Sequence, residues 1–354
     1  MERSDLFIDP MVANSSPFSQ DLLLWFDGIK RSMPWRATTQ APNPYHVWLS
    51  EIMLQQTTVK TVIPYFERFI ARWPTIEDLG RASLDDVLHA WQGLGYYSRA
   101  KNLHKCAQTI LQDHGGKFPD SRDALLKLPG VGPYTSAAIA SIAYESPAIA
   151  VGGNVMRVIS RYLCLGSIRP QLDQDTEAFL WQVIPTSRFG DFTQALMELG
   201  ALVCRPKNPL CLHCPLLATC KSHQTGEMES YPKKAPKKEL PRKYGHAFVL
   251  RNERGQILIR KRSGKRILSG LYEVPTTPWD LTLPEKSLEE FLLPELLRLK
   301  GEVDHTFTHF HLNLKVWEGT VPHLNCGEWV ASDQLKDYAL PTLMKKVIKT
   351  AIIL

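Results

Sequence analysis

Four cysteines stand close together in the middle of the chain, in the pattern Cys204-x6-Cys211-x2-Cys214-x5-Cys220. Four thiolates at this spacing suit tetrahedral zinc or a [4Fe–4S] cluster, and the spacing alone does not separate the two. Spare thiols seldom cluster in this way, so we interpret the segment as a metal site. The other three cysteines are isolated, and we expect them to be ordinary core or surface residues.

A second informative stretch is Leu128-Pro129-Gly130-Val131-Gly132. It separates a helical pattern over 121–128 from a helix of small residues over 134–143, so it reads as a tight turn between two helices. Both glycines can adopt positive φ, and the turn would direct backbone N–H groups outward at the start of the second helix. Such a helix start favours a phosphate, which indicates a helix-hairpin-helix that binds nucleic acid through Gly130, Val131 and Gly132. An ordinary helix corner closed by glycine is the alternative.

Glu51 is an acid in an apolar sequence, next to Trp48, Leu49, Ile52 and Met53. Apolar surroundings favour the neutral form of a carboxyl group, which suits a residue that donates a proton. A helical glutamate that pairs with an arginine is the alternative interpretation.

The elements that position these residues fall into two classes. Apolar residues at helical spacing dominate up to about residue 226, including one long helical stretch over 45–73. A glycine-hinged turn over 92–99 carries two tyrosines and Arg99 into the next helix. Further helices are predicted over 20–30, 83–91, 121–128, 134–143, 154–164, 174–184 and 191–204.

Beyond a basic, proline-rich segment over 227–243, the apolar period changes to that of strands. Residues 245–260 predict two strands joined at 252–255, and 271–274 and 311–317 predict further strands, with a helix over 287–300. We therefore expect a loose tail over 1–18, an all-α domain over 19–226, a linker over 227–243 and an α+β domain over 244–354.

The composition is that of an ordinary soluble protein. The 354 residues are 44% apolar, with 42 Lys and Arg against 36 Asp and Glu, which permits polyanion binding without requiring it. No apolar run is long enough to span a membrane, and the first residues lack the pattern of a secretory signal. We expect a cytoplasmic protein, in which the seven cysteines are thiols or metal ligands rather than disulfides.

Several stretches together resemble one family. MPWR, WLSEIMLQQT, GLGYYSRAKNLH, LPGVGPYT, the four-cysteine spacing and HTFTHFHL occur in the order typical of the adenine DNA glycosylases of the MutY family, within the endonuclease III helix-hairpin-helix superfamily. The resemblance covers about residues 20 to 350. It implies a multidomain protein with an all-α helix-hairpin-helix glycosylase domain, which carries a [4Fe–4S] cluster on the four cysteines, and an α+β Nudix-like domain.

The function implied by this resemblance is removal of adenine mispaired with 8-oxoguanine or guanine in double-stranded DNA, by a DNA-associated enzyme that we expect to be a monomer. The target base would be flipped out of the stack into a pocket. Gln56 and Tyr96 would enter the mismatch as wedges. The adenine pocket would be lined by Trp35, Arg36, Leu54 and Gln194.

The C-terminal domain resembles the Nudix-like domain that reads 8-oxoguanine in this family. No G-x5-E-x7-R-E-x2-E-E box follows Glu273, so we do not expect nucleotide hydrolysis. The family's lesion-reading loop is Phe-Ser-His, and this chain has Phe307-Thr308-His309. Threonine keeps the hydroxyl that can hydrogen-bond the base, and recognition is expected to survive.

The reaction calls for two carboxylic groups, one to protonate the base and one to stabilise the cationic sugar. By resemblance, Glu51 is the first and would protonate adenine N7. The second is absent, because Gly152 stands where the family has aspartate. The loss of one such group commonly costs on the order of 10² to 10⁴ in rate. The acids nearest in sequence are Glu145, Asp173 and Asp175.

Two further residues are assigned to the reacting centre by resemblance, Tyr134 and Asn154. Bifunctional relatives have lysine at the position of Tyr134, so lyase activity is not expected here. The resulting hypotheses are a monofunctional adenine glycosylase impaired at Gly152, or a lesion-binding protein that no longer excises the base. A glycosylase for another base fits poorly, because the adenine-pocket and lesion-loop residues are retained.

Overall fold

The computed structural model describes residues 16–36, 41–236, 239–264, 267–284, 297–321 and 324–352. The chain forms two compact units, one of residues 1–81 and 102–236 and the other of residues 82–101 and 237–354. In the residues that are described, no helix has the length and apolar character needed to cross a membrane.

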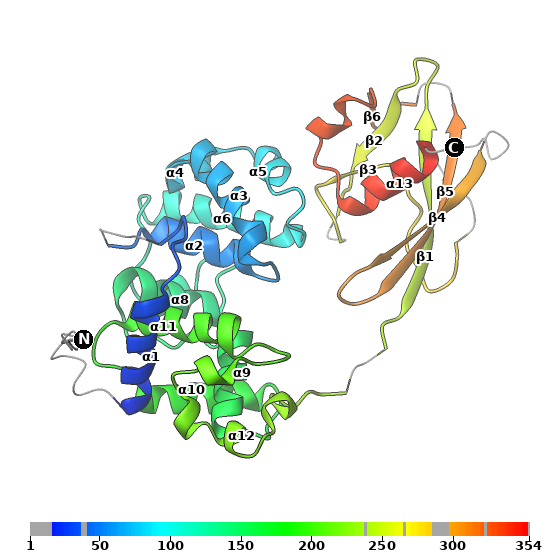
Figure 1. The fold of residues 1–354 in the computed structure, drawn as a ribbon. Coiled ribbons are helices and arrows are strands. Elements are labelled where there is room, and N and C mark those ends of the chain that lie inside the picture. Colours follow the sequence, from blue (N-terminus) through cyan, green and yellow to red (C-terminus); the bar gives the residue numbers. More distant parts are fainter. Residues whose placement is uncertain are drawn as a thin grey trace, which may run out of the picture. The chain divides into compact units, whose positions relative to one another are not determined.

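The first unit is helical (Figure 1). α1 begins at Pro17, inside the tail that the sequence predicted, because Ser16 caps it and Pro17 occupies its first position. The α- and π-helices that lie wholly in this unit, among the described residues, are α1 (Pro17–Ile29), α2 (Pro44–Leu54), α3 (Val59–Arg72), α4 (Ile76–Arg81), α7 (Arg122–Leu125), α8 (Pro133–Tyr144), α9 (Gly153–Leu163), α10 (Gln171–Val183), α11 (Phe189–Glu198), the π-helix η1 (Leu199–Val203) and α12 (Lys221–Gln224). Three short 3-10 helices follow η1 and are η2 (Cys211–His213), η3 (Leu217–Thr219) and η4 (Met228–Ser230).

The long helical stretch predicted over 45–73 is two helices rather than one. α2 ends at Leu54, and Gln55 leaves the helical region with ψ of 120°. Thr58 then caps α3, because its hydroxyl accepts a hydrogen bond from the Thr61 N–H. Four polar residues, at positions 55–58, interrupt the apolar period at this break, and the last of them is a favoured capping residue. The prediction of one continuous stretch overlooked this signal.

One hydrophobic core cluster of this unit lies between α1, α9, α10 and α11. α1 buries Leu22, Leu23 and Phe26 against Val158 and Ile159 of α9, with further apolar residues of α10 and α11. Full burial of one large apolar side chain contributes about 1.5 to 3 kcal/mol, so this face holds the helices in a fixed arrangement.

The helix-hairpin-helix turn is present, with one difference from the prediction. Gly130 has φ of 75°, and the Val131 N–H donates to the Leu128 carbonyl at 3.1 Å, as in a tight turn. Gly132 has φ of −93° and caps α8, so only the first of the two glycines uses positive φ. α7 ends at Leu125, about one helical turn before the end that the sequence predicted at residue 128.

The second unit contains a mixed six-stranded sheet in the order β3-β2-β1-β5-β4, with β6 paired to β2. β1 and β5 run parallel, from Arg242 beside His311 to Arg251 beside Thr320, and the other pairs are antiparallel. Its strands are β1 (Arg242–Arg251), β2 (Ile257–Lys261), β3 (Tyr272–Glu273), β4 (Arg298–Thr306), β5 (His311–Thr320) and β6 (Glu328–Val330).

One face of this sheet is covered by α13 (Thr342–Ile352), which buries Leu343, Met344 and Val347 against Val249 of β1 and Leu314 of β5 (Figure 1). The unit also includes α5 (Leu84–Ala90) and the first residues of α6 (Tyr97–Asp113), whose remainder belongs to the first unit.

Several sequence predictions for this unit need correction. The helix predicted over 287–300 is wrong at its end, because Arg298 to Lys300 form the start of β4, where Leu299 pairs with Trp317. Residues 285–296 lie outside the described residues. β1 begins at Arg242, inside the predicted linker, because Arg242 already pairs with His311. Sequence reasoning did not identify β6 or α13, whereas the hairpin of β1 and β2 is confirmed.

Candidate active site

A cavity of about 580 Å³ lies in the first unit, between α2, α8, α11, the start of α9 and the segment after α1. Its walls bring together residues that are far apart in the sequence. Seven of the predicted site residues line it: Trp35, Arg36, Glu51, Leu54, Tyr134, Asn154 and Gln194.

Glu51 is the buried acid of this cavity. Its side chain is on α2, and the residue is only 7% exposed. Burial raises the pKa of Glu51 to about 7, while a hydrogen bond with Tyr134 and the charge of Arg36 act in the opposite direction. A substantial part of Glu51 is therefore protonated at neutral pH.

Tyr134 and Asn154 stand at the starts of α8 and α9. Burial and the neighbouring Glu51 raise the pKa of Tyr134, so its hydroxyl is neutral and lies 3.7 Å from the Met197 sulfur. The Asn154 Oδ1 accepts a hydrogen bond from Arg157 Nη2 at 2.7 Å. These partners fix both polar groups at the wall of the cavity that contains Glu51.

Gly152 caps α9 with extended backbone and no side-chain hydrogen bond to the helix start. A Cβ atom at this position would lie 2.8 Å from Cε2 of the Tyr134 ring. The position that lacks the expected carboxylate is therefore in direct contact with Tyr134, and a larger residue there requires the ring to shift.

None of the three acids nearest in sequence takes the place of that carboxylate. Glu145 lines the cavity, but it follows the last turn of α8, about 16 Å along the helix axis from Tyr134. Asp173 on α10 accepts hydrogen bonds from Arg169, and Asp175 accepts from Ser167. Neither of these two aspartates is among the residues that line the cavity.

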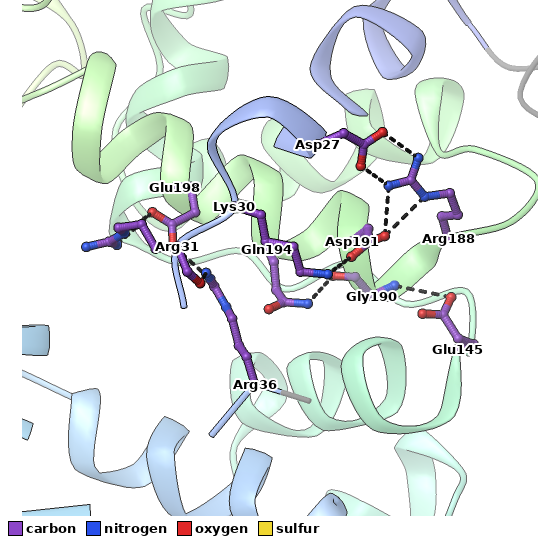
Figure 2. A network of polar contacts seen from close by, with 10 residues as sticks. All are labelled: Asp27, Lys30, Arg31, Arg36, Glu145, Arg188, Gly190, Asp191, Gln194 and Glu198. Carbon is purple, nitrogen blue, oxygen red and sulfur yellow. Dashed lines mark hydrogen bonds and ion pairs between the residues drawn. The ribbon is translucent and has the colours of Figure 1, made fainter. Parts of the chain in front are cut away.

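Glu198 is a functional candidate that sequence reasoning missed. It is 2% exposed near the end of α11, and its carboxylate accepts from Arg31 Nε at 2.8 Å and from Arg36 Nη2 at 2.7 Å (Figure 2). Arg36 Nη1 also donates to the Arg31 carbonyl at 3.0 Å. The signal in the sequence was an acid one helical turn after Gln194, directly after three apolar residues.

Gln194 points into the cavity from the same helix, with its amide nitrogen directed back toward the helix. Its Nε2 donates to the Gly190 carbonyl at 3.2 Å, which leaves the amide oxygen as its other polar end (Figure 2). Trp35 also lines the cavity and is 8% exposed, with its ring packed edge to face against Phe66 at 5.4 Å.

A second charged cluster borders the cavity. Asp191 accepts from Lys30 Nζ at 3.0 Å and from Arg188 Nη2 at 2.9 Å, and Arg188 also pairs with Asp27 (Figure 2). Glu145 accepts a hydrogen bond from the Gly190 N–H at 3.4 Å. These contacts join the ends of α1, α8 and α11.

The two predicted wedge residues share an unusual backbone conformation. Gln56, between α2 and α3, has φ of 59°, and Tyr96, before α6, has φ of 46°. Non-glycine residues seldom adopt this region, and when they do it often marks a functional site. The Tyr96 side chain is 49% exposed, and the Arg99 guanidinium lies over its ring at 5.6 Å.

The predicted lesion-reading residues form the turn between β4 and β5 in the second unit. The Phe307 N–H donates to the Phe310 carbonyl at 2.9 Å, which leaves Thr308 and His309 exposed at the tip. The Phe307 ring stacks on Trp279 at 5.8 Å, and the Arg262 guanidinium lies over the Trp279 ring at 4.3 Å. Half-buried aromatic residues therefore support an exposed polar tip.

The four cysteines of the predicted metal site line one cavity of about 30 Å³, together with the buried Arg161. Arg161 Nη1 lies 3.5 Å from the Cys204 sulfur. Burial raises the pKa of Cys214 to about 12, so a thiolate here needs a cation nearby. In the described part of the chain, no three His, Cys, Asp or Glu side chains already converge as ligands of a single ion. The case for a metal site therefore depends on the four cysteine thiols that line this one small cavity.

Comparison with known proteins assigns a class to this architecture. Residues 49–186 match the HhH-GPD superfamily of base excision DNA repair proteins, and residues 246–350 match the NUDIX domain. A solved structure of a thermostable thymine-DNA glycosylase superposes with a TM-score of 0.53 and 28% identity, over 59% of this chain and 95% of that chain. The molecule is a helix-hairpin-helix DNA glycosylase with a Nudix-like domain, as the sequence predicted.

Two curated relatives narrow this class. The adenine DNA glycosylase of Homo sapiens is 34% identical over 96% of this chain and 74% of its own length. The adenine DNA glycosylase of Buchnera aphidicola subsp. Schizaphis graminum is 34% identical over 94% of this chain and 98% of its own length. The chain belongs to the adenine DNA glycosylase family, which confirms the resemblance.

Proposed function

We propose that this protein hydrolyses the N-glycosidic bond of adenine paired with 8-oxoguanine or guanine in double-stranded DNA. The observation that carries the proposal is a buried acid, Glu51, with a pKa of about 7, in a cavity that also contains Tyr134, Asn154 and Gln194. A cavity of about 580 Å³ is large enough for a flipped base, which is how enzymes of this kind reach their target.

The residues of the cavity suit adenine. The Gln194 amide oxygen can accept a hydrogen bond from the exocyclic amine, because the amide nitrogen is held by the Gly190 carbonyl. Trp35 and Leu54 supply apolar walls against the base. A base with a carbonyl in place of that amine would bring two acceptors together and bind less well.

Bond cleavage then depends on proton transfer from Glu51. Protonation of N7 makes adenine a better leaving group, and the C1′–N9 bond breaks with its electron pair on adenine. Water then adds to C1′ of the cationic sugar, and the proton that it releases returns to the Glu51 carboxylate. Tyr134 hydrogen-bonds Glu51 and stays neutral, because burial and the neighbouring carboxyl group raise its pKa. Asn154, held by Arg157, lines the same cavity but carries no charge that could replace the carboxylate missing at position 152.

The absence of a carboxylate at position 152 favours a second candidate, a protein that binds the lesion without excising adenine. A glycine offers no charge to the cationic sugar, and such a loss costs on the order of 10² to 10⁴ in rate. The retained Glu51, Tyr134 and Gln194 support a slow enzyme, and we give this reading priority over silent binding.

The DNA would be held by three parts of the chain. The turn at Gly130, Val131 and Gly132 would lie against a phosphate at the start of α8, although the Val131 N–H itself is held by the Leu128 carbonyl. Gln56 and Tyr96 would fill the space left by the flipped base. The exposed Thr308 and His309 would contact 8-oxoguanine on the opposite strand.

The four cysteines would hold a [4Fe–4S] cluster, which supplies a rigid structural link in the segment after η1. Arg161 would lie beside it as a buried cation, and the Arg157 Nε donates to the Cys204 carbonyl at 2.8 Å. Iron and sulfide analysis of the purified chain, with its Cys211→Ser variant as control, tests this assignment.

The test of function is single-turnover adenine excision from an 8-oxoguanine:adenine duplex, with duplex affinity measured in parallel. The chain, Gly152→Asp and Glu51→Gln are compared. Slow excision that disappears in Glu51→Gln supports the enzyme. Tight binding without excision, restored by Gly152→Asp, would identify the lesion-binding protein instead.

A further inference from the structure

Glu198 is a buried acid on the cavity wall to which the proposed chemistry assigns no step. Its two carboxylate oxygens are engaged by separate cations, Arg31 on one side and Arg36 on the other (Figure 2). The side chain is 2% exposed, and that of Arg36 is 11% exposed. Solvent therefore screens the pair only weakly, and the position of each charge matters.

Arg36 has two acids within reach of its charge. It forms an ion pair with Glu198 at 2.7 Å, and the same charge acts on Glu51, on the same cavity. An ion pair between Arg36 and Glu51 would stabilise the carboxylate form of Glu51. Glu51 would then hold no proton to donate at neutral pH, and the base could not be protonated.

We propose that Glu198 is a positioning residue that holds the Arg36 guanidinium against α11 and so prevents it from forming an ion pair with Glu51. This inference rests on the proposed function. The second hydrogen bond of Arg36, to the Arg31 carbonyl, and the contact of Arg31 with the same carboxylate make the arrangement a closed triangle of two cations and one anion. Glu198 thus supports proton donation without touching the substrate.

Among the residues that the structure describes, no other group that faces Glu51 holds the Arg36 guanidinium away from it. Tyr134 of α8 faces Glu51 directly and is neutral, and Asn154 of α9 carries no charge. Asp191 is already paired with Lys30 and Arg188. The charged residues that line the cavity are Lys30, Arg31, Arg36, Lys60, Glu51, Glu145, Asp191 and Glu198.

The test is the pH dependence of single-turnover excision by Glu198→Gln, from about pH 5 to about pH 9. Excision by the unchanged chain is expected to fall above about pH 7, where Glu51 loses its proton. In Glu198→Gln this fall should begin at lower pH. At high pH, the variant should then be slower than the unchanged chain by about tenfold for each pH unit by which the fall is displaced. At low pH, where Glu51 is protonated in both proteins, the two rates should be equal. An equal deficit at every pH would mean that Glu198 is merely structural, and the proposal would be wrong.

Three variants make the result specific. Glu198→Asp keeps the charge and should restore the original pH profile. Arg36→Gln in the Glu198→Gln background removes the released cation and should move the fall back to higher pH. Asp191→Asn removes another carboxylate of α11 that does not contact Arg36, so its profile should keep its position on the pH axis.

A readout without excision separates this inference from the proposed function. The Glu51 carboxyl can be titrated by carbon NMR in the DNA-free protein, with Glu51→Gln to assign its signal. A lower titration midpoint in Glu198→Gln supports the positioning role even if no adenine is released. An unchanged midpoint overturns it, while loss of excision in the unchanged chain overturns only the proposed function.

Discussion

The cavity around Glu51 and the hairpin tip at Thr308 place their polar groups in opposite environments. Glu51 is 7% exposed, and burial changes its protonation. Thr308 and His309 are exposed, and only their supports, Phe307 and Phe310, are partly buried. Proton transfer to a base needs a group removed from water, whereas reading a base that remains in DNA needs groups that protrude. Substitutions in the cavity should therefore mainly change the rate of base excision, whereas substitutions at the hairpin should mainly change the choice of duplex.

The largest expected effect is in the cavity. Glu51→Gln removes the proposed proton donor and should lower adenine excision by about 10² to 10⁴, while the affinity for an 8-oxoguanine:adenine duplex should be kept. Single-turnover kinetics and duplex affinity measure the two separately. A similar loss of affinity would show that the cavity also determines binding.

The same variant should be more stable than the parent at high pH. The pKa of Glu51 is raised from 4.5 to about 7, so the folded state binds the proton more tightly and loses stability as the pH rises between these values. Above about pH 7 the gain for Glu51→Gln should reach about 1 to 3 kcal/mol. Urea unfolding at about pH 5 and about pH 8 tests this sign.

Gly152→Asp should raise excision by about 10², because it restores a negative charge near the sugar. The gain requires a small shift of the Tyr134 ring, since the new Cβ would lie 2.8 Å from it. Gly153→Asp is the matched control, because a Cβ there meets nothing within 4 Å. An equal gain in both variants would mean that general charge, and not position, is responsible.

Gly130→Ala should lower the free energy of unfolding by about 1 to 3 kcal/mol and weaken DNA binding. Its φ of 75° is unfavourable for alanine, and the added Cβ would lie 2.6 Å from Cβ of Asn102. Gly132→Ala, with φ of −93° and open space, should change stability far less. Thermal unfolding of both variants is the measurement, and equal losses would contradict the argument.

The smallest effect is expected at the hairpin. Trp279→Leu removes the ring that supports Phe307 and should reduce the preference for 8-oxoguanine:adenine over guanine:adenine by about three- to tenfold, a loss of about 1 kcal/mol. Excision from the guanine:adenine duplex should stay unchanged. A decrease on both duplexes would show that the hairpin influences more than lesion reading.

The sequence identified most of the helices and the cavity residues because their signals are local or occur in linked motifs. Periodicity located α8, α9 and the hairpin of β1 and β2 to within a few residues. The prediction failed at the break near Gln55, where it treated four polar residues and the cap Thr58 as part of one continuous helix. Periodicity also failed at β4. Residues 298–306 form a strand because they pair with β5, and their own sequence carries no clear strand signal.

By itself, the sequence determined the family and the two kinds of domain, and it predicted Glu51 as the acid and Gly152 at the place of the family's aspartate. Only the tertiary structure decided how that acid behaves. The burial that raises its pKa, the contact of Tyr134 with Gly152, and the engagement of Arg36 by Glu198 each join residues from separate helices. Electrostatic interactions depend on distance and on exclusion of water, and neither is encoded by neighbours along the chain.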